Sequence, residues 1–569
     1  MSVSTVSEKG ALLEPTAEAG PDQDLLSRPS AAATLPSPPP ISTTSRPSLI
    51  VRQWVVDDVL VKEKEGREAS GFELFLDLVM VAVVSQFAET AGNEDSSWSL
   101  FKFGIFSWLA WSVWQDARQY VNVSGNHDVL QRCYIFVLAF LLIGFSANAS
   151  AMTINCDYDD SADSTYDEGF GDPFLLPDGC WMDPGWLRSA RAALAFFLVA
   201  RLIRISLLIV YGLWLPRFRK AHLIRAVTLT CSSCMWVVLL GVTAPVAFLI
   251  LPLVSTAIEM LAQYISTPLL RLAHRASRSH GRAGPSSLLP ALNLEHTVDR
   301  TYLFVILVVG EMVSSAKYTG SLNHAGLKPI FWRAVLAVFT AFALLWLYQE
   351  QSASRTFSSA MRRHWFTGTT WQLLHFPLSA ALVLAAVSIS SFVKYGEAEQ
   401  KRQWYYGGAL SAILTSLFLL GILHKLLDRT RSALVPRSVR LGFRLAFAIL
   451  LALLPLIDNI SSAATLSATA LALLVLLLLE TIGQLGSVVD EEKARRAVEV
   501  EVEMDEEKGL AGVTEILVRS LAVDSVKGFE EVENELHPDE MGGFTSGIDQ
   551  SLRELTTMRL SSNKFAYAF

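Results

Sequence analysis

Charged residues are scarce in this chain of 569 residues, where they make up 18% of the sequence against 51% for hydrophobic residues. A soluble protein of this length usually divides into several domains, each with its own polar surface, and this composition supplies too little charge for that. The chain also lacks a basic excess, because 47 Lys and Arg stand against 55 Asp and Glu, a net charge of −8. This balance argues against nucleic acid as a partner.

Motifs of nucleotide-dependent and hydrolytic proteins are missing as well. The sequence contains no G-x-x-x-x-G-K-[ST], no G-x-G-x-x-G at a strand–helix junction, no G-x-S-x-G and no H-E-x-x-H. These absences disfavour ATP-driven pumping and the familiar hydrolase reactions. We therefore expect no enzymatic activity, no cofactor and no metal site.

Cysteine is rare, with five residues in the chain, too few for a disulfide-based scaffold. Cys156 and Cys180 occupy one polar loop and could form a disulfide if that loop faces an oxidising compartment. Cys231 and Cys234 form a C-x-x-C inside the apolar run LTCSSCMWVVLL, with no second pair and no suitably spaced histidine. We interpret them as small buried residues rather than metal ligands.

Long apolar runs, in contrast, are abundant. Runs of about twenty residues, the length that crosses a bilayer, alternate with short polar stretches. No such run occurs in residues 1–50, so the first one is expected to act as the targeting signal. The pattern predicts an all-α, polytopic transmembrane helical bundle with the lipid bilayer as its partner. About twelve spans are expected, near residues 72–91, 99–120, 131–152, 189–213, 223–242, 244–264, 299–317, 329–349, 370–394, 405–427, 438–457 and 464–485.

Basic residues are concentrated in every second loop. PRFRKAH, RLAHRASRSHGR and HKLLDRTRSALVPRSVR are basic, whereas CDYDDSADSTYDEGFGDP and YGEAEQKR are acidic or mixed. Because Lys and Arg collect in loops that stay in the cytosol, we expect these basic loops and both termini to be cytosolic. The plasma membrane and an endomembrane are both compatible with this pattern.

These features divide the chain into five segments. The segments are a disordered cytosolic N-terminal segment (1–67), a first transmembrane half (68–264), a cytosolic linker (265–298), a second transmembrane half (299–485) and a mostly disordered acidic tail (486–569). Residues 490–569 contain 19 Asp and Glu against 9 Lys and Arg. Such a tail is typical of an exposed cytosolic segment that could bind a partner.

The two transmembrane halves show a weak internal similarity. Glu259 and Gln263 end the sixth expected span as Glu480 and Gln484 end the twelfth, 221 residues later (480 − 259). Asp77 in the first span likewise precedes an acid in the seventh span by 234 residues (311 − 77). Two parallel six-helix repeats, a common plan among transporters, would produce this pattern, and chance similarity is the alternative.

Two acids one helical turn apart interrupt the first apolar run, GFELFLDLV. Ser70 and Glu73 fit the capping-box pattern, in which side chains bond the free amides of a helix start. Asp77 lies one turn further along on the same helix face, where capping does not explain it. Asp77 is therefore the stronger functional candidate of the two.

A second charged segment is EHTVDRTYLFVILVVGE, residues 295–311. Arg300 and Glu311 are eleven residues apart, close to three helical turns, and therefore share a helix face. Arg300 lies near the expected cytosolic boundary, where it could serve as an anchor. Glu311 could pair with an arginine of another span, and Arg201 and Arg204 are the obvious candidates.

Ionisable side chains at membrane depth usually face the bundle interior and indicate a functional site. A carboxylate in such a place can take up a proton near neutral pH. Structural ion pairs are the competing interpretation. The proposed ion-, proton- or substrate-binding residues are Asp77, Glu311, Glu73, Glu259, Glu480, Arg201, Arg204, Arg300 and His296.

At these motifs the chain resembles the low temperature requirement A family of membrane proteins, and its fungal members in particular. FELFLDLVMVAVVSQFA is similar to the family's E-L-F-F-D-L-V-F-V opening, and EHTVDRTYLFVILVVGE to its H-x-x-E-R-x-x-L-F-V-I-I-x-L-G-E segment. The resemblance covers about residues 68–485. The signature residues that it carries over are Glu73, Asp77, His296, Arg300 and Glu311. Asp299 and Met80 depart from the pattern, which has Glu and an aromatic residue there.

The resemblance implies a fold and no particular activity, so the function follows from the charged residues. We expect a secondary transporter of an unknown small solute or ion, coupled to a proton or cation bound by Asp77 and Glu311. A receptor or scaffold with purely structural acids, whose tail binds a cytosolic partner, is the alternative. An intramembrane lipid-modifying enzyme that uses His127, Asp128 and His296 is less favoured, since no nucleophile accompanies them.

Overall fold

The computed structural model describes a large part of residues 51–485. The described residues are 51, 53–56, 59–61, 69–94, 96–124, 128–156, 174–176, 180–182, 185–242, 245–279, 289–318, 326–352, 357–358, 360–396, 399–426, 434–457 and 459–485. The acidic tail 486–569, His127 and most of the N-terminal segment 1–67 lie outside them.

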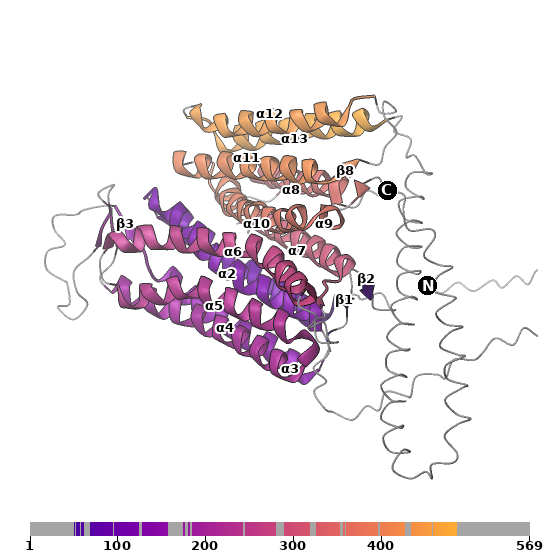
Figure 1. Cartoon of the computed structure of the whole chain (residues 1–569). Helices are drawn as coiled ribbons and strands as arrows, with labels where there is room; N and C mark the ends of the chain where they lie inside the picture. Colours follow the sequence, from indigo (N-terminus) through magenta and orange to yellow (C-terminus); the bar gives the residue numbers. More distant parts are fainter. Residues whose placement is uncertain are drawn as a thin grey trace, which may run out of the picture. The chain divides into compact units, whose positions relative to one another are not determined.

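Twelve long helices in the described part correspond one to one with the twelve expected spans (Figure 1). They are α1 (Gly71–Asn93), α2 (Trp98–Ser124), α3 (Val129–Ser150), α4 (Trp186–Trp214), α5 (Arg219–Gly241), α6 (Pro245–Ser279), α7 (Leu294–Ser315), α8 (Pro329–Ser352), α10 (Trp365–Lys394), α11 (Gln400–Leu423), α12 (Arg437–Leu453) and α13 (Ser462–Gln484). A single turn, α9 (Ala360–Arg363), precedes α10. The prediction of an all-α polytopic bundle is confirmed.

By length and composition, ten helices among the described residues are apolar enough to cross a membrane. The two long helices outside this set are α2 and α7, which carry ionisable residues along their length. Most of α2 is buried, including the three indoles Trp108, Trp111 and Trp114. A helix that contacts protein on most sides does not need an apolar surface for lipid, so these two helices can hold the polar residues of the interior.

The starts of several helices are set by polar capping residues. Ser70 accepts a hydrogen bond from the Glu73 amide at the start of α1, as the capping-box pattern predicts. Asp128 at α3, Asn293 at α7 and Ser461 at α13 cap their helices in the same way. Each side chain satisfies one of the amides that a helix start leaves free, so these boundaries follow from local sequence.

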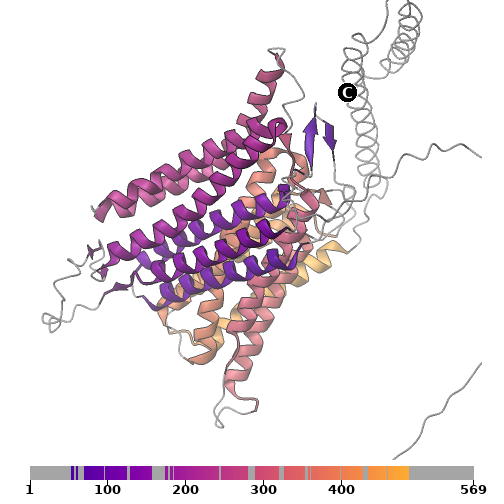
Figure 2. The same cartoon turned by 90° about the horizontal axis from the view of Figure 1, so that it is seen from below.

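Short strands in the loops between the helices form three small antiparallel sheets. One sheet has the order β2 (Val59–Val61), β1 (Trp54–Val56), β6 (Leu289–Pro290), the second has the order β3 (Ile154–Asn155), β5 (Trp181–Met182), β4 (Phe174–Leu175), and the third pairs β7 (Phe357–Ser358) with β8 (Lys425–Leu426). The first two lie at opposite ends of the helices (Figures 1 and 2). Strands β1 and β2 correct the expectation that all of residues 1–67 are disordered.

The cysteines behave differently in the two places where they cluster. Cys156 and Cys180 form a disulfide beside β3 and β5, with 4.2 Å between their Cα atoms. Cys231 and Cys234 are free and exposed on α5. The interpretation of this second pair as buried residues was wrong, because the apolar run around it faces outward from the bundle.

The same pairs of helices pack together in both halves of the bundle. Contacts of α1 with α2 and α3, followed by α3–α4, α4–α5, α5–α6 and α2–α6, are matched by contacts of α7 with α8 and α10, followed by α10–α11, α11–α12, α12–α13 and α8–α13. This agreement is what two parallel six-helix repeats produce. Depth within the helices corrects one expected pairing, however. Asp77 is six residues into α1, and the residue six positions into α7 is Arg300, not Glu311.

Close packing of α11 against α12 depends on a glycine. A Cβ at Gly407 would stand 2.8 Å from the Leu451 carbonyl oxygen and from Pro455, whereas a Cβ at Gly408 would meet nothing within 4 Å. We expect Gly407→Ala to destabilise the protein by about 1–3 kcal/mol, because backbone must move to admit the methyl group. Gly408→Ala should be neutral or slightly stabilising, since alanine favours a helix. Thermal unfolding of both purified variants in detergent measures the difference, and equal melting temperatures would refute this packing.

Candidate functional site

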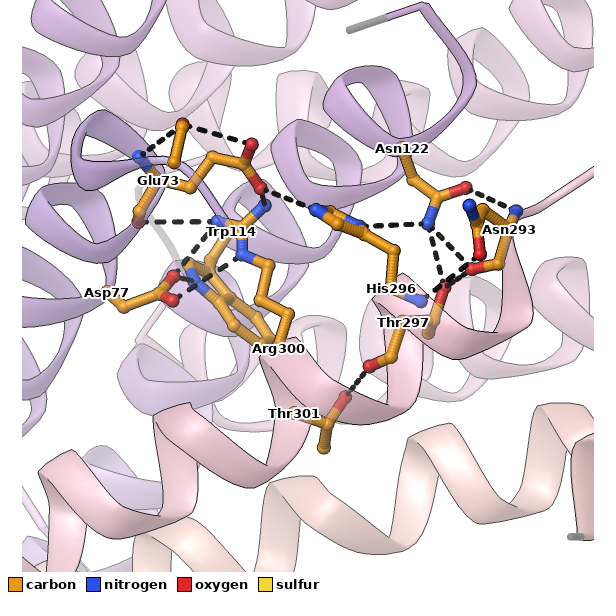
Figure 3. A network of polar contacts seen from close by, with 10 residues as sticks. Glu73, Asp77, Trp114, Asn122, Asn293, His296, Thr297, Arg300 and Thr301 are labelled. Carbon is orange, nitrogen blue, oxygen red and sulfur yellow. Dashed lines mark hydrogen bonds and ion pairs between the residues drawn. The ribbon is translucent and has the colours of Figure 1, made fainter. Parts of the chain in front are cut away.

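The two acids of α1 meet the two basic residues of α7 in a buried cluster (Figure 3). Glu73 and Asp77 are one turn apart on α1, and His296 and Arg300 are one turn apart on α7. Arg300 donates from Nη1 to Glu73 Oε2 and from Nη2 to Asp77 Oδ1, both at 3.0 Å. Trp114 of α2 donates to Asp77 Oδ1 at 2.6 Å. All four ionisable side chains are at most 1% exposed.

A chain of hydrogen bonds determines which nitrogen of His296 carries its proton. The Asn293 amide donates to Asn122 Oδ1 at 2.8 Å, which leaves the Asn122 amino group 3.2 Å from His296 Nδ1. That Nδ1 therefore accepts, and in the neutral ring Nε2 holds the hydrogen. Nε2 is 3.3 Å from Glu73 Oε2, so His296 approaches the cluster as a donor (Figure 3).

This geometry revises three interpretations. Arg300 is fully buried against two carboxylates and is not a boundary anchor. Asp77 is held by Arg300 and Trp114, so it is not a free carboxylate for a cation. Glu73 both takes part in the helix cap and binds Arg300. The departure at Asp299 leaves the cluster intact, because that residue is exposed.

Glu311 does not belong to the α1–α7 cluster. It is partly exposed and accepts a hydrogen bond from Ser85 of α1 at 2.9 Å. Among the described residues it forms no ion pair with Arg201 or Arg204, so the pairing expected from the sequence was wrong. Helices α1 and α7 thus contact each other at two depths. Opposite charges meet at the depth of Asp77, whereas Glu311 meets the neutral Ser85.

A second ionic cluster joins α2, α4 and α6 in the first half. Arg201 of α4 forms ion pairs with Asp116 of α2 and with Glu259 of α6. Trp108 donates to the other oxygen of Glu259 at 3.0 Å. Both Arg201 and Glu259 are less than 5% exposed. The two members that the sequence singled out are therefore partners of each other.

A polar cavity of about 170 Å³ adjoins the Arg201 cluster. Its wall comes from α2, α4, α5, α6 and the start of α10. It extends from the middle of α4 towards the end of the bundle where α7 and α10 begin, since it reaches Leu292 and Thr369. The ionisable residues that line it are Asp116, Arg201, Arg204, Arg225 and Glu259.

Glu480 belongs to a third cluster, in the second half. It accepts hydrogen bonds from Arg440 at 3.1 Å and from Arg444 at 2.6 Å, both on α12, and is 3% exposed. The space beside it is about 20 Å³, room for a single water molecule at most. This cluster joins α12 to α13 without a cavity that could hold a solute.

A buried pair also fastens the far end of α1. Glu94 follows the last residue of that helix and pairs with Lys102 of α2, which also donates to the Met152 carbonyl. The Ile154 amide donates to Glu94 at 3.2 Å. Burial raises the pKa of Glu94 above its ordinary value, and the nearby Lys102 charge only partly offsets this.

Three important residues were missed in the sequence. Asp116, Arg118 and Arg225 all lie inside expected spans, so their charge at membrane depth was the signal that could have identified them. Arg118 donates to Thr301 at 2.6 Å and stacks over the Trp114 ring, 4.9 Å from its centroid.

Within the described residues, no group of His, Cys, Asp and Glu is arranged to hold a metal ion.

Twelve long helices around buried ionic clusters define a polytopic α-helical membrane protein. The sequence profile described as Bacterial low temperature requirement A protein (LtrA) matches residues 68–479, well over half of the chain. The protein belongs to this family, as its motifs indicated. The comparisons with curated proteins and with solved structures find no match.

The contribution of the α1–α7 cluster to the stability of the protein can be tested by substitution. We expect Arg300→Met to cost about 3–5 kcal/mol of stability, because two buried carboxylates lose their counter-charge. Adding Glu73→Gln and Asp77→Asn should recover part of this loss, since no buried charge remains. Unfolding in detergent measures both variants. Arg402→Met removes a pair with the exposed Glu399 and a hydrogen bond to Asn93 but leaves no buried charge unpaired; it is the control and should cost about 1–2 kcal/mol. Equal losses in the single and triple variants would contradict this account.

Proposed function

We propose that the protein is a secondary transporter, coupled to a proton or cation, that binds a small solute in the cavity beside Arg201. The observation that carries the proposal is the cavity itself, about 170 Å³ in volume and lined by charged side chains of membrane-spanning helices. Ionisable groups at such depth are costly and usually mark a solute or ion path.

Contacts between the cavity and the α1–α7 cluster support coupling between them. Gln115 and Gln372 line the cavity, and Gln115 donates to Gln372 at 2.6 Å. Arg118 reaches the same Gln372 oxygen at 3.4 Å while stacking over Trp114, which is bonded to Asp77. A change of charge at Asp77 can therefore act on the cavity wall through two intervening side chains.

Proline residues inside two wall helices support movement around the cavity. Helix α6 contains Pro252 and Pro268, and α10 contains Pro377. Each proline removes a backbone hydrogen bond and permits a kink. Interrupted helices beside a solute site are common in transporters, where one part of the bundle moves against another.

A receptor or scaffold is the second candidate, and one observation favours it. Glu73, Asp77 and Glu480 each bind arginine, as expected of acids with a purely structural role. The enzyme alternative has no such support. Asp128 caps α3, His296 is held within the cluster, and His127 lies outside the described residues. We therefore propose transport, and we propose no catalytic activity.

Transport can be tested in proteoliposomes that contain a pH-sensitive dye. Small acids, bases, zwitterions and metal cations are added outside one at a time, and solute-dependent proton movement is recorded. For a solute that gives a signal, we expect Glu259→Gln to reduce the rate at least about tenfold, because losing one partner of a buried charge pair costs about 2–5 kcal/mol. Glu311→Gln is the matched control, since it neutralises an acid away from the cavity. Loss of flux in Glu311→Gln together with normal flux in Glu259→Gln would contradict the assignment of the solute site to this cavity.

Removing residues 490–569 separates the transporter from the receptor. If the protein is a scaffold whose acidic tail binds a cytosolic partner, deleting the tail should abolish binding of that partner. If the transmembrane bundle carries a solute, the truncated protein should retain nearly the full transport rate in the same proteoliposomes. Absence of flux in both the intact and the truncated protein, each of them folded, would favour the receptor.

A further inference from the structure

The charges that line the cavity do not balance. Three arginines face two carboxylates in its wall. Arg201 already binds both acids, Asp116 and Glu259. Within the described part of the chain, Arg204 and Arg225 form no ion pair. The cavity therefore carries an excess of positive charge at membrane depth.

Arginine keeps its charge in such a place, because its guanidinium does not lose its proton in proteins. Arg204 is 6% exposed, and its guanidinium carbon is 5.3 Å from the centroid of the Tyr120 ring. An aromatic face stabilises a desolvated cation by about 2 kcal/mol or somewhat more, which offsets only part of the several kcal/mol that burial of the charge costs. An anion in the cavity would supply the missing stabilisation.

Three hydroxyl groups of the cavity wall offer no hydrogen to a solute. Thr228, Ser232 and Ser266 donate their hydroxyl hydrogens to carbonyl groups of their own helices. These hydroxyl hydrogens are therefore not available to a solute. A cation in the cavity would be repelled by the neighbouring guanidinium groups. Guanidinium groups present two parallel N–H donors that match the oxygens of a carboxylate or a phosphate.

The size of the cavity limits the solute. A cavity of about 150 Å³ holds a benzene molecule of six heavy atoms, and this one measures about 170 Å³. Acetate, lactate and phosphate fit within this volume.

We infer that the cavity binds a small oxyanion, a carboxylate or a phosphate, between Arg204 and Arg225. This inference rests on the proposed function, because it names the class of solute for the same cavity. The bound anion balances the two arginines that lack an acid, and the pairs of Arg201 with Asp116 and Glu259 remain intact. A proton is then the suitable coupling ion, since a metal cation would have to displace Arg201 from both carboxylates.

Equilibrium binding to the full-length protein in detergent tests the inference without any need for transport. Potassium lactate and potassium phosphate are titrated at pH 7 against potassium chloride of equal ionic strength, and heat release and melting temperature are recorded. We expect saturable binding of one oxyanion above the chloride background. The lactate and phosphate titrations separate a carboxylate site from a phosphate site. No specific signal from either salt would overturn the inference.

Variants locate the binding site. Arg204→Gln and Arg225→Gln should each weaken binding at least about tenfold, because each removes a charge-assisted contact. Arg219→Gln is the matched control on α5, since Arg219 is exposed, bonds to the Gly212 carbonyl and does not line the cavity. Arg225→Lys keeps the charge and loses the paired donors, so it should bind with intermediate affinity even if a neutral variant fails to fold. Equal weakening in Arg219→Gln would overturn the site.

Binding and transport can fail separately. Oxyanion binding that depends on Arg204 and Arg225, without any flux in proteoliposomes, would support the inference and contradict the transporter. Proton-coupled flux of a cation, without oxyanion binding, would support the transporter and overturn the inference.

Discussion

A charge buried among helices in a membrane must have a partner nearby, and this requirement connects most of the structure. The cost of an unpaired buried charge is several kcal/mol, comparable with the whole stability of many proteins. Arg300 therefore joins helices that start 223 residues apart in the sequence (294 − 71), since it binds both acids of α1. Arg201 joins α4 to α2 and α6, and Glu480 joins α13 to α12. The arrangement of the bundle follows these pairs.

The same requirement distinguishes the cavity from the clusters. Around Arg300 and Glu480 the opposite charges meet directly, and the space beside Glu480 is only about 20 Å³, so these clusters suit a structural role. Beside Arg201 the helices enclose a cavity of about 170 Å³, and among the described residues Arg204 and Arg225 form no ion pair. A wall with surplus charge, bordered by proline-containing helices, is suited to a solute that arrives and leaves. The closed clusters therefore suit support of the bundle, and the open cavity is where we propose that the solute binds.

The helices and most of the charged residues of the ionic clusters could be predicted from the sequence. The pairing of those residues could not. The expected match of Asp77 with Glu311 compared similar motifs, whereas depth within the helices places Arg300 opposite Asp77. Glu311 instead meets Ser85. Cys231 and Cys234 were expected to be buried because their surroundings are apolar, but an apolar surface in a membrane protein can face lipid. Arg225 was overlooked because it is the one charged residue of its expected span, 223–242, and Asp116 because no recognisable motif surrounds it.

The sequence by itself determined the class of protein, the number and approximate positions of its helices and the family to which it belongs, although α6 continues to Ser279, well into the expected linker 265–298. These properties depend on runs of neighbouring residues, on caps such as Ser70 and Asn293 and on motifs of fewer than twenty residues, all of which are local. Tertiary structure alone decided the ion pairs and the cavity. A partner for Arg300 or Arg201 depends on which helices are neighbours and on how each is rotated about its axis. Those two quantities come from packing of the whole bundle, and no local pattern records them.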